Sequence, residues 1–419
     1  MAEARLTFSR RRIDVITIEP DAILAFVALA GLVFVPVLKS LGALIFLAAG
    51  CALLVRRYQV QAGLCLRYWY IFALPAFCIV SVIWSAYPGA TFRSGVQLAA
   101  TIAIAVSIAA TTSARTFSRA LFVLYLIAML ASVVFGDVRN DTGAWLGIYG
   151  SKNALAGAAS TFVIVSLAQV LDSETLPRLR ILGLLGAMFG GLMLLMAQSI
   201  SAIIVLPPAI LILILLLFLY RLSPLQQVGL IVFLLIVSAL MVVLALVYSD
   251  ALFALLLDTT GKDATLTGRT DLWRIALALI ADRPVLGMGY QAFWVKGHAA
   301  AEALWYRFGI DGRSGFNFHN TYLSNAVEIG IFGVFLQVVV LYGAAITTGI
   351  WALRTHRAEA SLLFILVMMV VMVSFVEVPV FFQFSLRSVI VTCAFVYAVR
   401  GLTAARRRTI TQTPVDARS

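Results

Sequence analysis

The chain has 419 residues, of which 62% are hydrophobic and 12% are charged, and its formal net charge is +12. Soluble domains carry about a quarter charged residues, so this composition excludes an ordinary soluble enzyme and is typical of a membrane protein. The basic residues are dispersed between apolar runs and form no dense basic face, which excludes a nucleic acid as partner.

Twelve apolar runs are long enough, or nearly long enough, to cross a membrane as helices. They lie at residues 22–38, 41–55, 68–84, 95–113, 119–135, 153–171, 181–197, 200–220, 228–248, 321–350, 361–378 and 384–400. The first two predict a tight hairpin interrupted at Lys39–Ser40, and the long run at 321–350 predicts a helix that is tilted or begins outside the hydrocarbon. The sequence therefore predicts an all-α integral membrane protein with about twelve transmembrane helices.

The distribution of basic residues predicts the orientation of these spans. If residues 1–21 form a cytoplasmic tail, most of the basic residues between spans fall on the cytoplasmic side, as the positive-inside rule requires. The short loops on the other side hold only Lys39, Arg93, Arg139, Lys152 and Arg387. We therefore expect spans 1–9 within residues 22–248, spans 10–12 within 319–400, and a basic cytoplasmic tail at 401–419.

One long segment, residues 249–318, interrupts this pattern of short loops on the outer side. Within it, "DLWRIALALIAD" predicts a helix that Pro284 ends, and "AAAEALWYRF" predicts a second short helix. A loop of this length with helices of its own is usually functional. We expect the functional site to involve this outer loop.

Within the outer loop, the stretch "GRTDLWR" contains a candidate phosphate-binding residue. Gly268 predicts a turn, Thr270 or Asp271 would cap the following helix, and Arg269 would then lie at the helix entrance. A guanidinium beside a helix N-terminus is well suited to bind phosphate. The alternative is that each arginine here belongs to a solvated ion pair that contributes little. Arg274 does not share a face of a continuous helix with Arg269.

The stretch "GFNFHNTYLSNAVEIGIFG" places His319 just before the tenth span. Asn320 or Thr321 would be a natural N-cap, and the polar cluster would then simply begin a helix. That explanation gives no reason for His319, whose imidazole can act as a general base near neutral pH. Glu328, deeper in the same run, is costly in a membrane unless it faces a cavity or a partner.

Metal binding is not expected from this sequence. The three histidines are dispersed, no HExxH motif or closely paired histidines occur, and the cysteines Cys51, Cys65, Cys78 and Cys393 show no CxxC spacing. We therefore expect neither a metal ion nor another cofactor.

Four stretches together resemble the O-antigen ligase and polymerase family. They are "SVIWSAYPGATFRSG" at 81–95, "GIYGSKNALAG" at 147–157, "LTGRTDLW…ADRPVLGMGYQAFW" in the outer loop, and "HNTYLSNAVEIGIFG" from His319 onward. The residues of these motifs are most similar to those of exopolysaccharide polymerases of the ExoQ type. The resemblance covers roughly residues 70–400, and its motifs occur in the family's order.

The resemblance implies a glycosyltransferase of the bacterial inner membrane with its active site on the periplasmic side. Such an enzyme moves a glycan from an undecaprenyl-pyrophosphate carrier to a hydroxyl, which belongs to a second lipid-linked repeat in a polymerase and to the lipid A core in a ligase. It implies His319 as the base and Arg269 as a pyrophosphate ligand, with Asn320 as a further substrate-binding candidate. Membrane lipids and a chain-length regulator are the other expected partners.

The sequence also departs from the family pattern at one place. Family members often carry Ser-Arg between the seventh and eighth helices, whereas this chain reads "AQSISAI", with Ile200 after Ser199. Lys152, Arg93 and Arg274 are candidates to supply the missing positive charge. Lys152 equally fits an interfacial lysine that extends its amine to water, and Arg93 could simply anchor the start of the fourth helix.

A transporter of polysaccharide or of a small molecule is the alternative from a different functional class. In that interpretation Glu328 and Glu377 would line a proton or substrate pathway. The large polar outer loop and the lack of a clear internal repeat argue against it.

Overall fold

The structure is a computed structural model that describes residues 19–219, parts of 222–236, and residues 264–313 and 315–412. Its described part is mostly helical, in agreement with the predicted all-α class. The helices before the outer loop are α1 (Pro20–Val33), α2 (Val35–Leu38), α3 (Ser40–Arg56), α4 (Tyr58–Arg67), α5 (Trp69–Val80), α6 (Pro88–Thr111), α7 (Ala114–Phe135), α8 (Lys152–Leu171), α9 (Pro177–Ala197) and α10 (Ile200–Phe218). They are followed by α13 (Ala264–Asp282), α14 (Ala299–Arg307), α15 (Thr321–Thr355), α16 (Ala358–Val373) and α17 (Leu386–Gln412).

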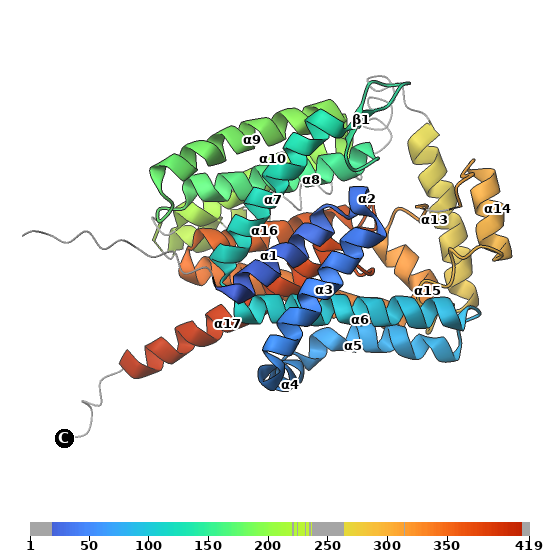
Figure 1. The fold of residues 1–419 in the computed structure, drawn as a ribbon, viewed down its shortest axis with the longest axis horizontal. Coiled ribbons are helices and arrows are strands. Elements are labelled where there is room, and N and C mark those ends of the chain that lie inside the picture. The colour runs from blue at the N-terminus through green and yellow to red at the C-terminus, as the bar shows by residue number, and fades with distance from the viewer. Residues whose placement is uncertain are drawn as a thin grey trace, which may run out of the picture.

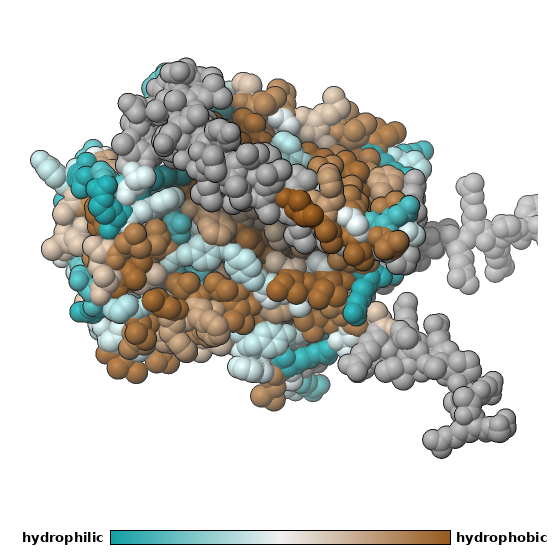
Figure 2. Space-filling view, turned by 180° about the vertical axis from the view of Figure 1, so that it is seen from behind, coloured by the Kyte–Doolittle hydropathy of each residue, from teal (hydrophilic) through white to brown (hydrophobic). Residues whose placement is uncertain are grey.

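Six of the described helices, α6, α7, α8, α9, α15 and α17, are long and apolar enough to cross a membrane. Five shorter apolar helices correspond to the predicted spans that begin near residues 22, 41, 68, 200 and 361. The predicted span at 228–248 lies largely outside the described residues, so the count of twelve stays a prediction. Apolar side chains cover much of the face shown in Figure 2, and strongly polar ones gather toward its edges.

The first two apolar runs form the predicted hairpin. Lys39 has a φ of 49° between α2 and α3 and interrupts the helix where the sequence predicted the break. Gly31 of α1 and Gly42 of α3 face each other so closely that a β-carbon on either one would lie 2.6–2.7 Å from the other's carbonyl oxygen. Small residues are what allow two membrane helices to approach backbone to backbone.

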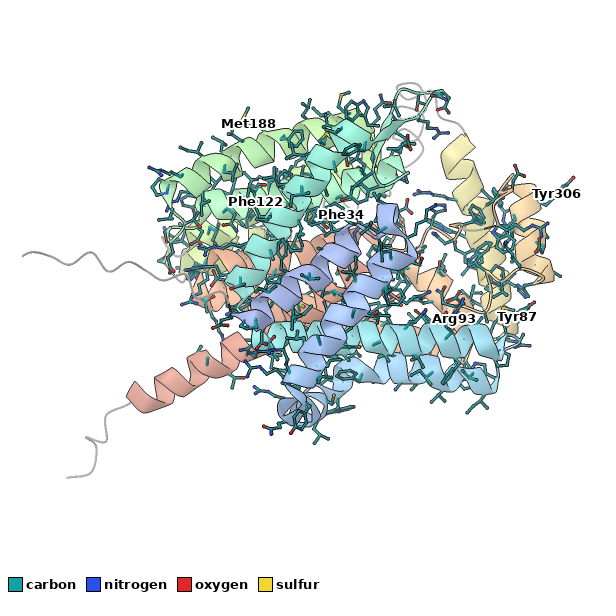
Figure 3. The ribbon with its side chains drawn as sticks, in the orientation of Figure 1. Phe34, Tyr87, Arg93, Phe122, Met188 and Tyr306 are labelled. Carbon is teal, nitrogen blue, oxygen red and sulfur yellow. The ribbon has the colours of Figure 1, made fainter. Side chains whose placement is uncertain are left out.

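A buried core joins the helices of the bundle, and α8 lies deep within it, since most of its residues are buried. In contrast, α9 exposes a row of large apolar side chains that includes Met188, whose side chain points away from the bundle in Figure 3. A two-stranded antiparallel sheet, β1 (Asp137–Val138) and β2 (Trp145–Gly147), connects α7 to α8. This small hairpin is an addition to the predicted all-α architecture.

The outer loop forms a small folded unit with its own core. Leu272, Phe293, Trp305 and Phe318 are buried together in a cluster separate from that of the bundle. Figure 1 shows α13 and α14 at one end of the molecule, while the C-terminal end of α17 lies at the other. We call this segment, residues 264–318, the outer unit.

Two sequence-based expectations about local structure were wrong. Residues 264–267 are already helical, so Gly268 and Arg269 lie inside α13 instead of forming a turn at its entrance. Glu377, expected within the eleventh span, lies beyond α16, which ends at Val373. Pro379 explains this second difference, because proline and the residue before it disfavour a continuing helix.

The long tenth apolar run is one helix, α15, with a break at Gly330, whose φ is 65° and ψ is −176°. The backbone of the segment that follows α13 forms hydrogen bonds with the backbone of α15 on both sides of the break. The N–H groups of Met288 and Gly289 donate to the carbonyl oxygens of Val327 and Glu328 at 3.0 and 2.8 Å. In addition, the N–H of Ile331 donates to the carbonyl of Pro284 at 2.8 Å. The interruption thus leaves these backbone groups paired and joins the outer unit to the bundle.

We expect Gly330→Ala to destabilise the protein by about 1–3 kcal/mol or more, because L residues are strained at this φ. In addition, a β-carbon at Gly330 would overlap the Val285 carbonyl. The measurement is the thermal unfolding midpoint of the purified protein in detergent.

Gly191→Ala on α9 is the matched control, because a β-carbon there meets no atom within 4 Å. An unchanged midpoint for Gly330→Ala would contradict the interpretation of the break as a fixed feature of α15.

Candidate functional site

Three separate parts of the chain meet at the carboxylate of Glu377, in the loop between α16 and α17. Its Oε2 lies 3.0 Å from Nδ1 of His319, and its Oε1 accepts a hydrogen bond from Nη2 of Arg269 at 2.8 Å. The side chains of all three residues are only 21–28% exposed. The structure therefore brings together the predicted base and the predicted phosphate ligand, through a residue that was not predicted for this position.

Hydrogen bonds and buried side chains position the backbone of the residues before and after His319. His319 itself has a φ of 50°, and its N–H donates to Oδ1 of Asn317 at 2.7 Å. The preceding Phe318 is fully buried in the core of the outer unit, and its carbonyl accepts a hydrogen bond from Nε1 of Trp273. A left-handed conformation at a residue other than glycine is uncommon and is often found at functional sites.

On the other side of His319, Asn320 is the N-cap of α15, as predicted. Its Oδ1 accepts hydrogen bonds from the N–H groups of Tyr322 and Leu323 at 2.9 and 3.0 Å. Its Nδ2 donates to the carbonyl of Phe375 at 3.0 Å. The oxygen of the Asn320 side chain thus caps α15, and its nitrogen connects the start of this helix to the loop that carries Glu377. Both contacts help to position the pair of His319 and Glu377.

The bundle contributes a second line of contacts to Glu377. Nδ2 of Asn153, the second residue of α8, donates to Oε1 of Glu377 at 3.2 Å. Oγ of Ser199 in turn donates to Oδ1 of Asn153 at 3.0 Å. We call Arg269, His319, Glu377, Asn153 and Ser199 the Glu377 cluster.

Sequence reasoning missed Asn153 and Glu377 as site residues, although a signal was present for each. Asn153 lies in the quoted motif "GIYGSKNALAG", and Ser199 lies in "AQSISAI", the stretch that departs from the family pattern. For Glu377 the signal was Pro379, which disfavours a helix that continues to the end of the predicted eleventh span.

Burial and charge act in opposite directions on the pKa of Glu377. Burial of the carboxyl raises its pKa, but the hydrogen bonds and charges of His319 and Arg269 lower it by more, so the pKa lies below its ordinary value of 4.5. Glu377 is therefore ionised at neutral pH. An ionised carboxylate beside Nδ1 favours the tautomer in which Nδ1 carries the hydrogen, which leaves Nε2 free to accept a proton.

The other predicted site residues lie away from this cluster. Arg274 is 79% exposed and pairs with Asp271, which also pairs with Arg307 of α14. Arg93 is exposed on α6, near the end that carries Tyr87 in Figure 3, and Tyr87 contacts His298 of the outer unit. Lys152 begins α8 immediately before Asn153. A substrate-binding role for these three residues stays a prediction.

Glu328 lies where α15 breaks, and it is almost fully buried. Its Oε2 accepts hydrogen bonds from the N–H of Gln291 at 2.9 Å and from Nε2 of the same residue at 3.4 Å. The carboxyl that seemed costly in a membrane is thus partnered by the outer unit. Among the described residues, no group of three or more His, Cys, Asp or Glu side chains is placed to hold a metal ion.

Comparison with known proteins gives two matches. The family model described as O-Antigen ligase matches residues 185–338, a region that includes Arg269 and His319 but neither Asn153 nor Glu377. The Exopolysaccharide production protein ExoQ of Rhizobium meliloti is 32% identical over 300 residues, which span 68% of this chain and 66% of that protein. The chain belongs to the O-antigen ligase family. This membership and the apolar helices identify it as a multi-pass membrane protein, and they confirm the resemblance found in the sequence.

We expect the stabilisation that Glu377 contributes to this O-antigen ligase family member to decrease at acidic pH. Because the pKa of Glu377 is lowered in the folded state, the stabilisation is complete above the ordinary value of 4.5 and is lost as the pH falls below it. Glu377→Gln should reduce the free energy of unfolding at pH 7 by about 1–3 kcal/mol, because it removes charge-assisted hydrogen bonds.

The measurement is thermal unfolding of both proteins across a pH series. The difference between wild type and Glu377→Gln should stay constant down to about pH 5 and shrink below it. A difference that disappears between about pH 7 and pH 5 would show that the carboxylate is not held ionised by its partners.

Proposed function

We propose that this protein is a membrane glycosyltransferase that polymerises oligosaccharide repeat units carried on undecaprenyl pyrophosphate into exopolysaccharide. The observation that carries the proposal is the Glu377 carboxylate, which holds an imidazole and a guanidinium side by side at 3.0 and 2.8 Å. Glycosyl transfer from a pyrophosphate needs a base for the attacking hydroxyl and a cation for the leaving group. Both groups are present in the Glu377 cluster.

In the proposed reaction, Nε2 of His319 accepts the proton of the acceptor hydroxyl as its oxygen attacks the anomeric carbon of the donor. The bond between that carbon and the pyrophosphate oxygen breaks, and the lipid pyrophosphate leaves with the electron pair. Arg269 stabilises the negative charge on the leaving group, and Glu377 stabilises the imidazolium that forms. Direct attack inverts the configuration at the anomeric carbon. No metal ion takes part in these steps.

The proposed orientation places the Glu377 cluster on the periplasmic side of the bacterial inner membrane, with both termini in the cytoplasm. The outer unit supports this orientation, because it contributes Arg269 to the cluster, ends directly before His319, and corresponds to the loop that the positive-inside rule assigns to that side. The donor is then a lipid-linked glycan within the membrane, the acceptor is a second one, and a chain-length regulator is a further proposed partner.

A ligase that transfers the glycan to the lipid A core is the second candidate, because the matching family model is described as O-Antigen ligase. Polymerase and ligase differ only in the acceptor hydroxyl, and the Glu377 cluster serves both. We favour the polymerase because the relative from Rhizobium meliloti is named for exopolysaccharide production.

We expect His319→Ala to reduce glycan transfer about 10²–10⁴-fold, the usual contribution of a general base. The protein in nanodiscs would be given undecaprenyl-pyrophosphate-linked repeat units, and products would be separated by size. A ladder that only the unmutated protein forms would support the polymerase. A single addition that requires lipid A core would support the ligase instead.

The matched control is His298→Asn in the outer unit, at the N-cap of α14, where asparagine is a favoured residue. Full-length polymer from His319→Ala would contradict the assignment of the base. Transport of a solute without glycan transfer, lost on neutralising Glu328 or Glu377, would favour the transporter.

Arg269→Ala should lower the rate of donor use about 10²–10³-fold, because it removes the cation that stabilises the leaving group. Arg283→Ala is the control, since Arg283 is exposed just after α13. The rate would be followed at varied concentrations of the lipid-linked donor. Unchanged donor kinetics for Arg269→Ala would contradict its role.

A further inference from the structure

A second arginine, Arg387, lies near the Glu377 cluster and is not part of it. Arg387 is the second residue of α17 and lines a cavity between α8, α10, α16 and α17. Apart from Arg387 and two hydroxyl groups of α8, the lining is apolar and includes Val205, Val370 and Ile390. The sequence placed Arg387 in a short outer loop and gave it no role.

The charge of Arg387 has no close counterion in the part of the chain that the structure describes. Neither an ion pair nor a hydrogen bond links its guanidinium to a described residue, and its electrostatic neighbours are Tyr125, Tyr149 and Glu377. The Glu377 carboxylate is already shared by Arg269 and His319. A cation in apolar surroundings is costly unless it is paired, so the place is suited to an anion from outside the chain.

Two hydroxyl groups near Arg387 are also without partners among the described residues. Oη of Tyr149 and Oγ of Ser160 are buried and make no hydrogen bond to this part of the chain. Ser160 lines the same cavity as Arg387, and Tyr149 is one of the groups that interact electrostatically with the guanidinium. Other buried hydroxyls of the described residues also lack partners, but these two differ from them in lying beside a guanidinium without a close counterion. A ligand rich in acceptor oxygens would satisfy both hydroxyls and the guanidinium together.

The guanidinium of Arg387 lies against Gly157 of α8. A β-carbon at Gly157 would overlap Nη2 of Arg387, so a larger residue there would displace the end of the arginine side chain. Gly157 follows Asn153 by four residues, and residues at that spacing lie on the same face of a helix. One face of α8 therefore contacts Glu377 through Asn153 and Arg387 through Gly157, about one turn, or 5.4 Å, apart.

We propose that Arg387, with the hydroxyls of Tyr149 and Ser160, binds the pyrophosphate of the polyprenyl-linked donor on the side of the lipid. Arg269 contacts the same pyrophosphate from the side of the sugar. This inference rests on the proposed function, since it assigns the binding site of that donor. Arg387 would also supply the positive charge that the chain lacks at Ile200.

The test measures binding and not turnover. Wild-type protein in nanodiscs would be titrated with farnesyl pyrophosphate as a short lipid probe, and separately with inorganic pyrophosphate, with binding followed by intrinsic tryptophan fluorescence. We expect both probes to bind to the wild type, because both carry the pyrophosphate that the guanidinium would contact.

Arg387→Ala should weaken binding of the lipid probe at least tenfold, and Gly157→Ala should also weaken it, because it displaces the guanidinium without removing the charge. Tyr149→Phe is the most selective variant, because its hydroxyl has no partner within the described protein. It should leave the thermal unfolding midpoint unchanged or slightly raised while weakening binding several-fold. Arg283→Ala is the control for a nonspecific loss of positive charge.

Normal binding by both Arg387→Ala and Tyr149→Phe would overturn the proposal and leave the proposed glycosyltransferase intact, provided that the wild type binds the lipid probe. A wild type that binds neither probe would count against the proposed function itself. If Arg387→Ala does not fold, Tyr149→Phe alone decides, since loss of an unpartnered hydroxyl does not weaken the folded state.

Discussion

The arrangement of the candidate site depends on one ionised carboxylate, Glu377, in partly buried surroundings. A carboxylate there is unfavourable by itself, and it is stable because His319, Arg269 and Asn153 donate hydrogen bonds to it from three different parts of the chain. Each of these donors in turn has its own structural support. The outer unit, the start of α8 and the loop before α17 are therefore held together at one point.

The break in α15 provides the second connection between the outer unit and the bundle. Gly330 interrupts the helix, and the backbone of residues 284–289 pairs with the groups that the interruption leaves open. Glu328 adds a side-chain link to Gln291 at the same place. Because His319 lies just before α15 and Arg269 lies on α13, this connection fixes the distance between the two candidate residues.

Much of the fold could be predicted because apolar length and charge asymmetry are properties of single segments. The helical ranges, the interruption at Lys39, the end of α13 before Pro284 and the cap at Asn320 all follow from local rules. His319 and Arg269 were predicted as site residues from local motifs as well. By contrast, Glu377 owes its role to residues 58 and 108 positions away, and no local pattern encodes such a contact. Arg387 was missed for the same reason, because a missing counterion is visible only once the neighbouring helices are in place.

The charges of the site suggest how binding and chemistry are connected in the proposed reaction. Before the donor binds, Glu377 offsets the charge of Arg269, whereas Arg387 has no described counterion; the pyrophosphate is therefore attracted first to Arg387. When His319 takes up the proton of the acceptor, its imidazolium becomes a second cation 3.0 Å from the Glu377 carboxylate. The carboxylate then offsets less of the charge of Arg269. The charge of Arg269 then becomes available as the leaving pyrophosphate gains negative charge. A single carboxylate would thus couple deprotonation of the acceptor to stabilisation of the leaving group, without a metal ion.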